Sequence, residues 1–236
     1  MITAMHKLTR LGLGFLLLLA LMVLGLPSSG WAAGSQLKQR LQALSTDNVT
    51  AQALLLMQDK RDSTGLNDAT FLLEKQLGAQ PDDRTVRMFY GYGQLFQAGD
   101  YLRKKNYMRA AELSKLGFYA LDEAAETEPE NWRLFWLRAR MDAFVPASNG
   151  RCVVAIKDVN TLNDAVPASL KPMLTLMRAR AAESCNDGNM AALAWKTLHE
   201  MDADGEALLE NNAGTAPAWT SEEIDEVILP LMEGKG

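Results

Sequence analysis

Residues 106–144, NYMRAAELSKLGFYALDEAAETEPENWRLFWLRARMDAF, decide the fold class. In the first half, small and apolar residues recur at three- and four-residue steps, at Ala110, Leu113, Gly117, Leu121 and Ala124. This spacing is typical of one face of an α-helix. Pro129 then marks the start of a second helix and Pro146 the end of that helix, because proline disfavours the helical conformation in the preceding residue. We therefore predict helices over residues 106–126 and 130–144.

The same periodicity continues on both sides of this stretch, and no strand-like alternation follows residue 36. The further helices that it predicts cover residues 36–44, 51–58, 62–78, 84–97, 152–162, 168–184 and 189–201. Thr220 and Glu223 have capping-box spacing and begin a last short helix, which we expect to end near Pro230. Residues 205–219 are interpreted mostly as a loop, because they hold few large apolar side chains. The predicted fold class is all-α.

Length and charge limit the function classes. The chain has 236 residues, 48% of them hydrophobic, which is enough for one well-buried core. The formal net charge of −5 makes nucleic acid an improbable partner. Residues 103–105 are a short basic run. We interpret this run as a solvated helix end, with binding to phosphate or lipid as the less favoured alternative.

The N-terminus has the three-part layout of a secretory signal peptide. A basic start precedes an apolar run over residues 11–26 and the turn-forming residues 27–30. We predict cleavage after Ala32 or Ala33, which leaves one α-helical domain, residues 34–236, in the periplasm. The alternative is an uncleaved anchor, which would be the chain's only attachment to a membrane. The apolar run is shorter than the roughly 20 residues that span a bilayer, so cleavage is favoured.

Cys152 and Cys185 both follow the signal segment. An even number of cysteines in an oxidising compartment predicts a disulfide. The alternative, a pair of metal-binding or redox thiols, lacks a C-x-x-C spacing, and His199 is the only histidine beyond the signal segment. We therefore expect neither a metal site nor a cofactor.

Catalytic residues are not indicated either. Neighbouring carboxylates occur at Asp122 and Glu123, at Glu126 and Glu128, and at Glu222 and Glu223. We interpret them as solvated charges at helix ends. Asp202, Asp204 and Glu206 alternate as in a calcium loop, but the later ligands of such a loop are missing. We expect a non-enzymatic protein.

Two aromatic clusters, within residues 89–101 and 132–136, give the better indication of a binding site. Aromatics in one helix cannot all face the same way, so some of them could line a groove. The predicted groove residues are Tyr90, Tyr92, Trp132, Trp136 and Arg138. A groove of aromatics and arginine would suit a peptide segment or an apolar carboxylate. Ordinary core packing with solvated arginines is the favoured alternative.

Small and large residues recur at matching steps before two proline-containing turns. They are Ala69, Leu73 and Pro81 in the first stretch and Gly117, Leu121, Ala124 and Pro129 in the second, with Gly91 and Ala139 in the helices that follow. Over residues 67–143 this pattern resembles the tetratricopeptide repeat, and the resemblance implies helix pairs that approach closely at small side chains. The two prolines are 48 residues apart by number (129 − 81) rather than about 34, which implies an irregular array.

The helix order is also similar to that of the exported T component associated with some TRAP-type solute transporters. The similarity rests on two features. One is Tyr90-Gly91-Tyr92 within a predicted helix, and the other is the turn Asn149-Gly150, which follows an aromatic helix that ends at a proline. From the partial repeat and the absence of catalytic groups we expect a periplasmic helical adaptor that binds another envelope protein or a transporter component. The alternative is a small-ligand-binding accessory subunit of a solute transporter.

Overall fold

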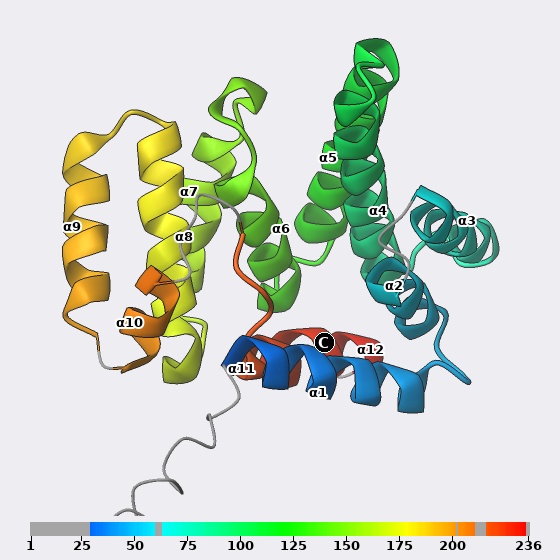
Figure 1. Cartoon of the computed structure of the whole chain (residues 1–236), viewed down its shortest axis with the longest axis horizontal. Helices are drawn as coiled ribbons and strands as arrows, with labels where there is room; N and C mark the ends of the chain where they lie inside the picture. The colour runs from blue at the N-terminus through cyan, green and yellow to red at the C-terminus, as the bar shows by residue number, and fades with distance from the viewer. Residues whose placement is uncertain (1–28, 60–62, 202, 211–215, 235–236) are drawn as a thin grey trace, which may run out of the picture.

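A computed structural model describes residues 29–59, 63–201, 203–210 and 216–234. Within these ranges the chain is helical and contains no strand, so the predicted all-α fold is confirmed (Figure 1). Most of the predicted signal segment, residues 1–28, lies outside the described residues.

The elements follow one another along the chain as α1 (Ser29–Leu44), α2 (Val49–Asp59), α3 (Ser63–Ala79), α4 (Arg84–Arg103), α5 (Tyr107–Thr127), α6 (Trp132–Phe144), the 3₁₀ turn η1 (Ala147–Asn149), α7 (Cys152–Leu162), the 3₁₀ turn η2 (Ala168–Leu170), α8 (Lys171–Ser184), α9 (Gly188–His199), α10 (Ala203–Glu210), α11 (Ser221–Glu223), the π-helical turn η3 (Ile224–Ile228) and α12 (Leu229–Met232).

Most predicted helices are present, with four differences. The first helix already begins at Ser29, and α4 continues to Arg103 beyond the predicted end at residue 97. The loop predicted from residue 205 was wrong in its first part, because α10 occupies Ala203–Glu210. Pro230 does not end the last helix. It lies in the first turn of α12, directly after the π-helical turn η3, and the helix continues to Met232.

Helix starts follow from side-chain caps. The carboxylate of Asp83 accepts a hydrogen bond from the backbone N–H of Val86 at the start of α4. Asn106 caps α5 in the same way. The predicted capping box of Thr220 and Glu223 is confirmed, with both of its reciprocal hydrogen bonds present. Each cap satisfies backbone donors that have no partner within the helix.

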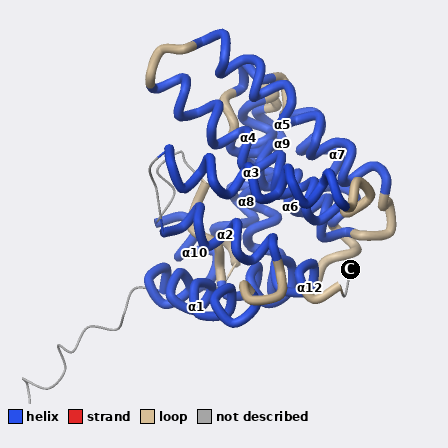
Figure 2. Tube along the Cα trace, turned by 90° about the vertical axis from the view of Figure 1, so that its right-hand side faces the viewer, coloured by secondary structure: helices blue, strands red, loops and turns tan. Residues whose placement is uncertain are grey.

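Helices pack mainly against their neighbours in sequence, and the chain then closes on itself. From α2 to α5 and from α6 to α9, each helix contacts the next along the chain. Helix α1 lies beside the C-terminal helices in both views (Figures 1 and 2). The side-chain amide of Asn48, after α1, donates to the carbonyl of Met232 at 2.9 Å. The two ends of the described chain therefore share one layer.

The closest helix contact joins α4 and α5 through two glycines. A Cβ atom added to Gly91 would lie 2.3 Å from Leu121 Cδ1 and 2.8 Å from the carbonyl oxygen of Gly117. A Cβ added to Gly117 would lie 2.7 Å from Leu95 Cγ. No real Cβ tolerates such distances, so the two backbones touch only because neither residue has a side chain.

The predicted disulfide between Cys152 and Cys185 is confirmed, with the two Cα atoms 5.5 Å apart. It joins the first residue of α7 to the residue that ends α8. The cross-link therefore fixes one end of this helix pair.

None of the described helices is both long enough and apolar enough to cross a membrane.

We expect Gly117→Ala to destabilise the protein by about 1–3 kcal/mol, because overpacking at the α4–α5 contact outweighs the helix propensity that alanine gains. The free energy of unfolding, measured by circular dichroism in urea, tests this expectation. Gly78→Ala is the matched control, because a Cβ at Gly78 in α3 meets no atom within 4 Å. The control should be neutral or more stable, and equal effects of the two substitutions would contradict the close contact.

Candidate functional site

The residues predicted to line a groove are mostly core residues. The side chains of Tyr92, Trp136 and Arg138 are buried, so the open groove expected at these positions is filled by the protein itself. Tyr90 in α4 and Trp132 in α6 are half-buried. The other interpretation, ordinary core packing of the aromatics with solvated arginines, is correct for the buried rings of Tyr92 and Trp136. It is wrong for Arg138, because this arginine is buried rather than solvated.

The polar atoms of the two buried aromatics are engaged inside the protein. The hydroxyl of Tyr92 donates to the carbonyl of Leu137 at 2.5 Å and so joins α4 to α6. Burial raises the pKa of Tyr92 above its ordinary value, which keeps this hydroxyl a neutral donor. The Nε1–H of Trp136 donates to Glu223 at 3.1 Å. Neither group is therefore free to bind a ligand.

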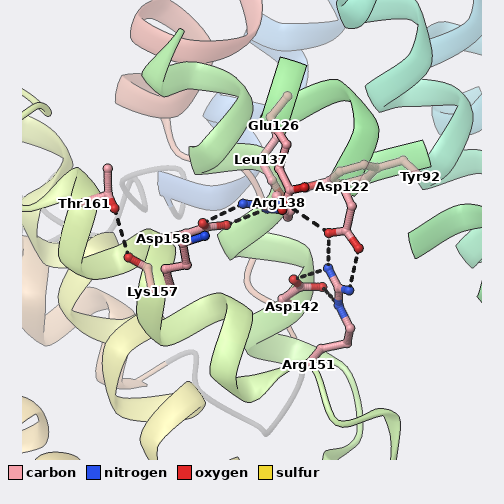
Figure 3. A network of polar contacts seen from close by, with 10 residues as sticks. All are labelled: Tyr92, Asp122, Glu126, Leu137, Arg138, Asp142, Arg151, Lys157, Asp158 and Thr161. Carbon is pink, nitrogen blue, oxygen red and sulfur yellow. Dashed lines mark hydrogen bonds and ion pairs between the residues drawn. The ribbon is translucent and has the colours of Figure 1, made fainter. Parts of the chain in front are cut away.

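Arg138 is the centre of a network of arginines and carboxylates that joins α5, α6 and α7 (Figure 3). Its Nε and Nη2 each donate to Asp158 in α7 at 2.8 Å, in a two-pronged arrangement. Its Nη1 donates to Asp122 at 3.3 Å and to Glu126 at 3.1 Å, both in α5. Burial acts to lower the pKa of Arg138, but its bonds to Asp158 and Glu126 and the charges of Asp158 and Asp122 together outweigh burial and raise the pKa. Arg138 is therefore a buried cation matched by acids from two helices.

Arg151 extends this network from the turn before α7. It donates two hydrogen bonds to Asp122, at 2.7 and 2.9 Å, and two to Asp142, at 2.7 and 2.9 Å. Its guanidinium also stacks on the ring of Phe118 in α5, 4.7 Å from the ring centre. We call Asp122, Glu126, Arg138, Asp142, Arg151 and Asp158 the arginine network.

The arginine network holds more acids than bases. Among the described residues that form it, four carboxylates face two guanidiniums, a formal charge of −2 with every acid ionised. Burial raises the pKa of Asp142 to about 7, even though the bonds from Arg151 act in the opposite direction. Burial raises the pKa of Asp158 as well, against the bonds from Arg138. The network therefore holds a proton near neutral pH, which reduces its excess negative charge.

A second buried cluster fastens the C-terminal segment to α6. Glu223, which has no solvent exposure, accepts from Arg140 Nε at 2.7 Å as well as from Trp136. Arg140 also donates to the carbonyl of Pro217 at 2.8 Å, and its guanidinium lies 3.8 Å from the ring centre of Trp219. We call these five residues the Glu223 clamp.

Our interpretation of the acids as solvated helix-end charges was wrong for Asp122 and Glu223, which hold buried arginines. One signal in the sequence was available. Arg138, Arg140 and Asp142 lie among the apolar residues of α6, where a solvated charge has no room. The partners of these residues could not be read from the sequence, because several of them lie in other helices.

The remaining candidates show no catalytic arrangement. His199 is exposed, as expected of a surface residue, and both cysteines are in the disulfide. Among the described residues, no group of three or more histidines, cysteines or acids is placed to hold a metal ion. Asp202 and part of the neighbouring acidic run lie outside the described residues or have undescribed side chains. The two buried clusters act structurally, by fixing how α5, α6, α7 and the C-terminal segment pack.

We expect Glu223→Gln to destabilise the protein by roughly 3–5 kcal/mol, because Arg140 then stays buried without its counter-charge. The midpoint of urea unfolding measures the loss. Glu222→Gln is the matched control, since Glu222 is the exposed neighbour in the same helical turn. If both variants unfold at the same urea concentration as the parent protein, the clamp contributes nothing to stability.

A second prediction concerns pH. The folded-state pKa of Asp142, about 7, lies above the ordinary 3.8, so the folded protein binds this proton more tightly than the unfolded chain. The stability that Asp142 contributes is therefore fully present below about pH 4 and is lost as the pH rises to about 7.

Asp142→Asn tests this sign. We compare the free energies of unfolding of the parent protein and the variant between pH 4.5 and pH 8. The difference in favour of the parent protein should be largest near pH 4.5 and smaller at pH 8. Asp82→Asn is the control, because the Asp82 side chain is 92% exposed. A difference between the parent protein and the Asp142→Asn variant that does not change with pH would contradict the raised pKa.

Comparison of the chain with protein-family models, with curated proteins and with solved structures finds no match in any of the three. The resemblances to the tetratricopeptide repeat and to the T component therefore stay predictions.

Proposed function

We propose that this chain is a non-enzymatic adaptor of the periplasm that binds another envelope protein through the exposed side of its α4–α5 hairpin. One observation carries the proposal: a long, stiff helical hairpin extends from the body and exposes large apolar side chains on its outer face.

The shape of the hairpin supports this role. Helix α4 has 20 residues and α5 has 21, and α5 packs mainly against α4. Its C-terminal half is fixed to α6 and α7 by the arginine network, through Asp122 and Glu126. Its N-terminal half extends beyond the body together with the end of α4 (Figure 1). The hairpin is therefore anchored at its base, and the outer face of α5 and the turn between the two helices are accessible.

The outer face of α5 carries Leu116, which is 44% exposed, and Tyr119, which is 67% exposed. These residues are three positions apart in a helix and lie on the same side of it. Tyrosine is enriched at protein interfaces, where its ring provides contact area and its hydroxyl a hydrogen bond. A rigid helix face with such residues suits a partner that docks without large rearrangement.

The disulfide supports the proposed location. A structural disulfide persists in oxidising compartments such as the periplasm and is rare in the cytosol. Together with the predicted signal peptide, it favours an exported protein.

The alternative function, a ligand-binding transporter subunit, depended on Tyr92, Trp136 and Arg138 as an accessible pocket. All three make internal hydrogen bonds. No observation on the described residues favours this alternative over the adaptor.

Photo-crosslinking in the periplasm of the source cell tests the adaptor. A crosslinking residue at Tyr119 should trap one specific envelope protein, and the same residue at Asn160, exposed on α7, should not. With that partner purified, Leu116→Ala and Tyr119→Ala should each weaken binding about 5- to 30-fold if they are anchors of the interface. Equal trapping from both positions, or no effect of either substitution on affinity, would count against this docking face.

A further inference from the structure

The tip of the α4–α5 hairpin combines exposed apolar side chains with basic ones. We define the hairpin tip as residues 102–109, all of which are exposed. Lys105 has a positive φ of 58°, and its N–H donates to the carbonyl of Leu102, which closes the end of α4. Asn106 then caps α5. The backbone of the turn is therefore held by defined hydrogen bonds, and its side chains are exposed to solvent.

Three large apolar side chains project from this turn. Leu102 is 53% exposed, Tyr107 is 63% exposed and Met108 is 86% exposed. Met108 is the most exposed large apolar side chain of the described residues. Exposed apolar groups that gather at a projecting point indicate a surface that contacts something less polar than water.

Basic residues surround these apolar groups. Arg103, Lys104, Lys105 and Arg109 carry four positive charges, and the acids that pair with them are Asp100 and Glu112. The local balance is therefore +2 (four minus two), in a chain whose formal charge is −5. The ion pairs with these acids are exposed, so they can rearrange at little cost when the cations meet another anion.

We propose that the hairpin tip binds the surface of an anionic lipid membrane. Ammonium and guanidinium groups attract the phosphates of lipid headgroups, and tyrosine, leucine and methionine enter the boundary between headgroups and acyl chains. Lysine is depleted at protein–protein interfaces, so the Lys104-Lys105 pair favours lipid over a protein partner at this point. The tip does not include Leu116 and Tyr119, so this inference does not depend on the adaptor interface.

The binding should be weak and electrostatic. Each basic residue near an anionic surface contributes about a fivefold change in affinity. Salt screens such attraction, since the Debye length is about 8 Å at physiological ionic strength. The membrane contact is therefore reversible. It is lost when the anionic lipid is left out or when the salt concentration is raised.

A dye attached to the tip reports this contact locally. The full chain, purified after export, receives a polarity-sensitive dye through Met108→Cys, because both native cysteines are held in the disulfide. The expected result is a blue shift of the dye with vesicles of phosphatidylglycerol and phosphatidylcholine. Pure phosphatidylcholine vesicles and inorganic phosphate should cause none. A second sample labelled through Asn160→Cys, far along the chain on α7, should stay unchanged.

Charge variants test the electrostatic part. Arg103→Gln with Lys105→Gln removes two cations from the tip and should weaken vesicle binding about 25-fold. Lys157→Gln with Lys196→Gln, at exposed positions on α7 and α9, changes the net charge equally and should leave binding within twofold. Melting curves confirm that each variant is folded.

Three results would overturn the proposal. One is the absence of a blue shift when the dye at the tip is mixed with anionic vesicles. Another is an equal loss of binding in both double variants, which would mean that only the net charge matters. The third is a dye response to inorganic phosphate alone, which would indicate a site for free anions. Trapping of the adaptor's partner at Tyr119 is a separate result, so either proposal can fail without the other.

Discussion

The full positive charge of Arg138 at a position without solvent exposure is the constraint on which the rest of the structure depends. Arginine does not lose its proton in proteins, so burial requires acids held in hydrogen-bonding geometry. Asp158 supplies two of these bonds from α7, and Asp122 supplies one from α5. These bonds fix how α5 and α7 pack against α6. Such a cluster specifies the arrangement of the helices more than it adds to stability.

This constraint gives the α4–α5 hairpin a fixed base. Gly91 and Gly117 bring the two hairpin helices into backbone contact, and Tyr92 attaches α4 to the same helix that carries Arg138. The base of the hairpin is thus bound to α6, and α4 also packs along α3, where Gln97 donates to Asn67.

The sequence allowed the helices to be predicted but not the polar core. Helical periodicity identifies which face of a segment is apolar, and turn residues mark its ends, so α7 was predicted at Cys152–Leu162, where it lies. Periodicity does not reveal which distant acid faces a buried arginine. Arg140 and Glu223 are 83 positions apart, and only the assembled fold brings them together. Aromatic residues on α4 and α6 gave the same pattern for a groove as for a core, and three of the five predicted groove residues proved to be core.

The packing of α1 and Asn48 beside the C-terminal helices bears on how the protein matures. Glu223 completes the bonding of Trp136 in α6, and the carbonyl of Met232 accepts from Asn48 near the start of the domain. A chain that emerges N-terminus first, from a ribosome or a secretion channel, lacks these partners until residues 223–232 are released. Its native fold therefore cannot form in full while the chain is still being threaded. Prematurely terminated products would keep an uncompensated arginine in α6, and this leaves them open to proteolytic removal.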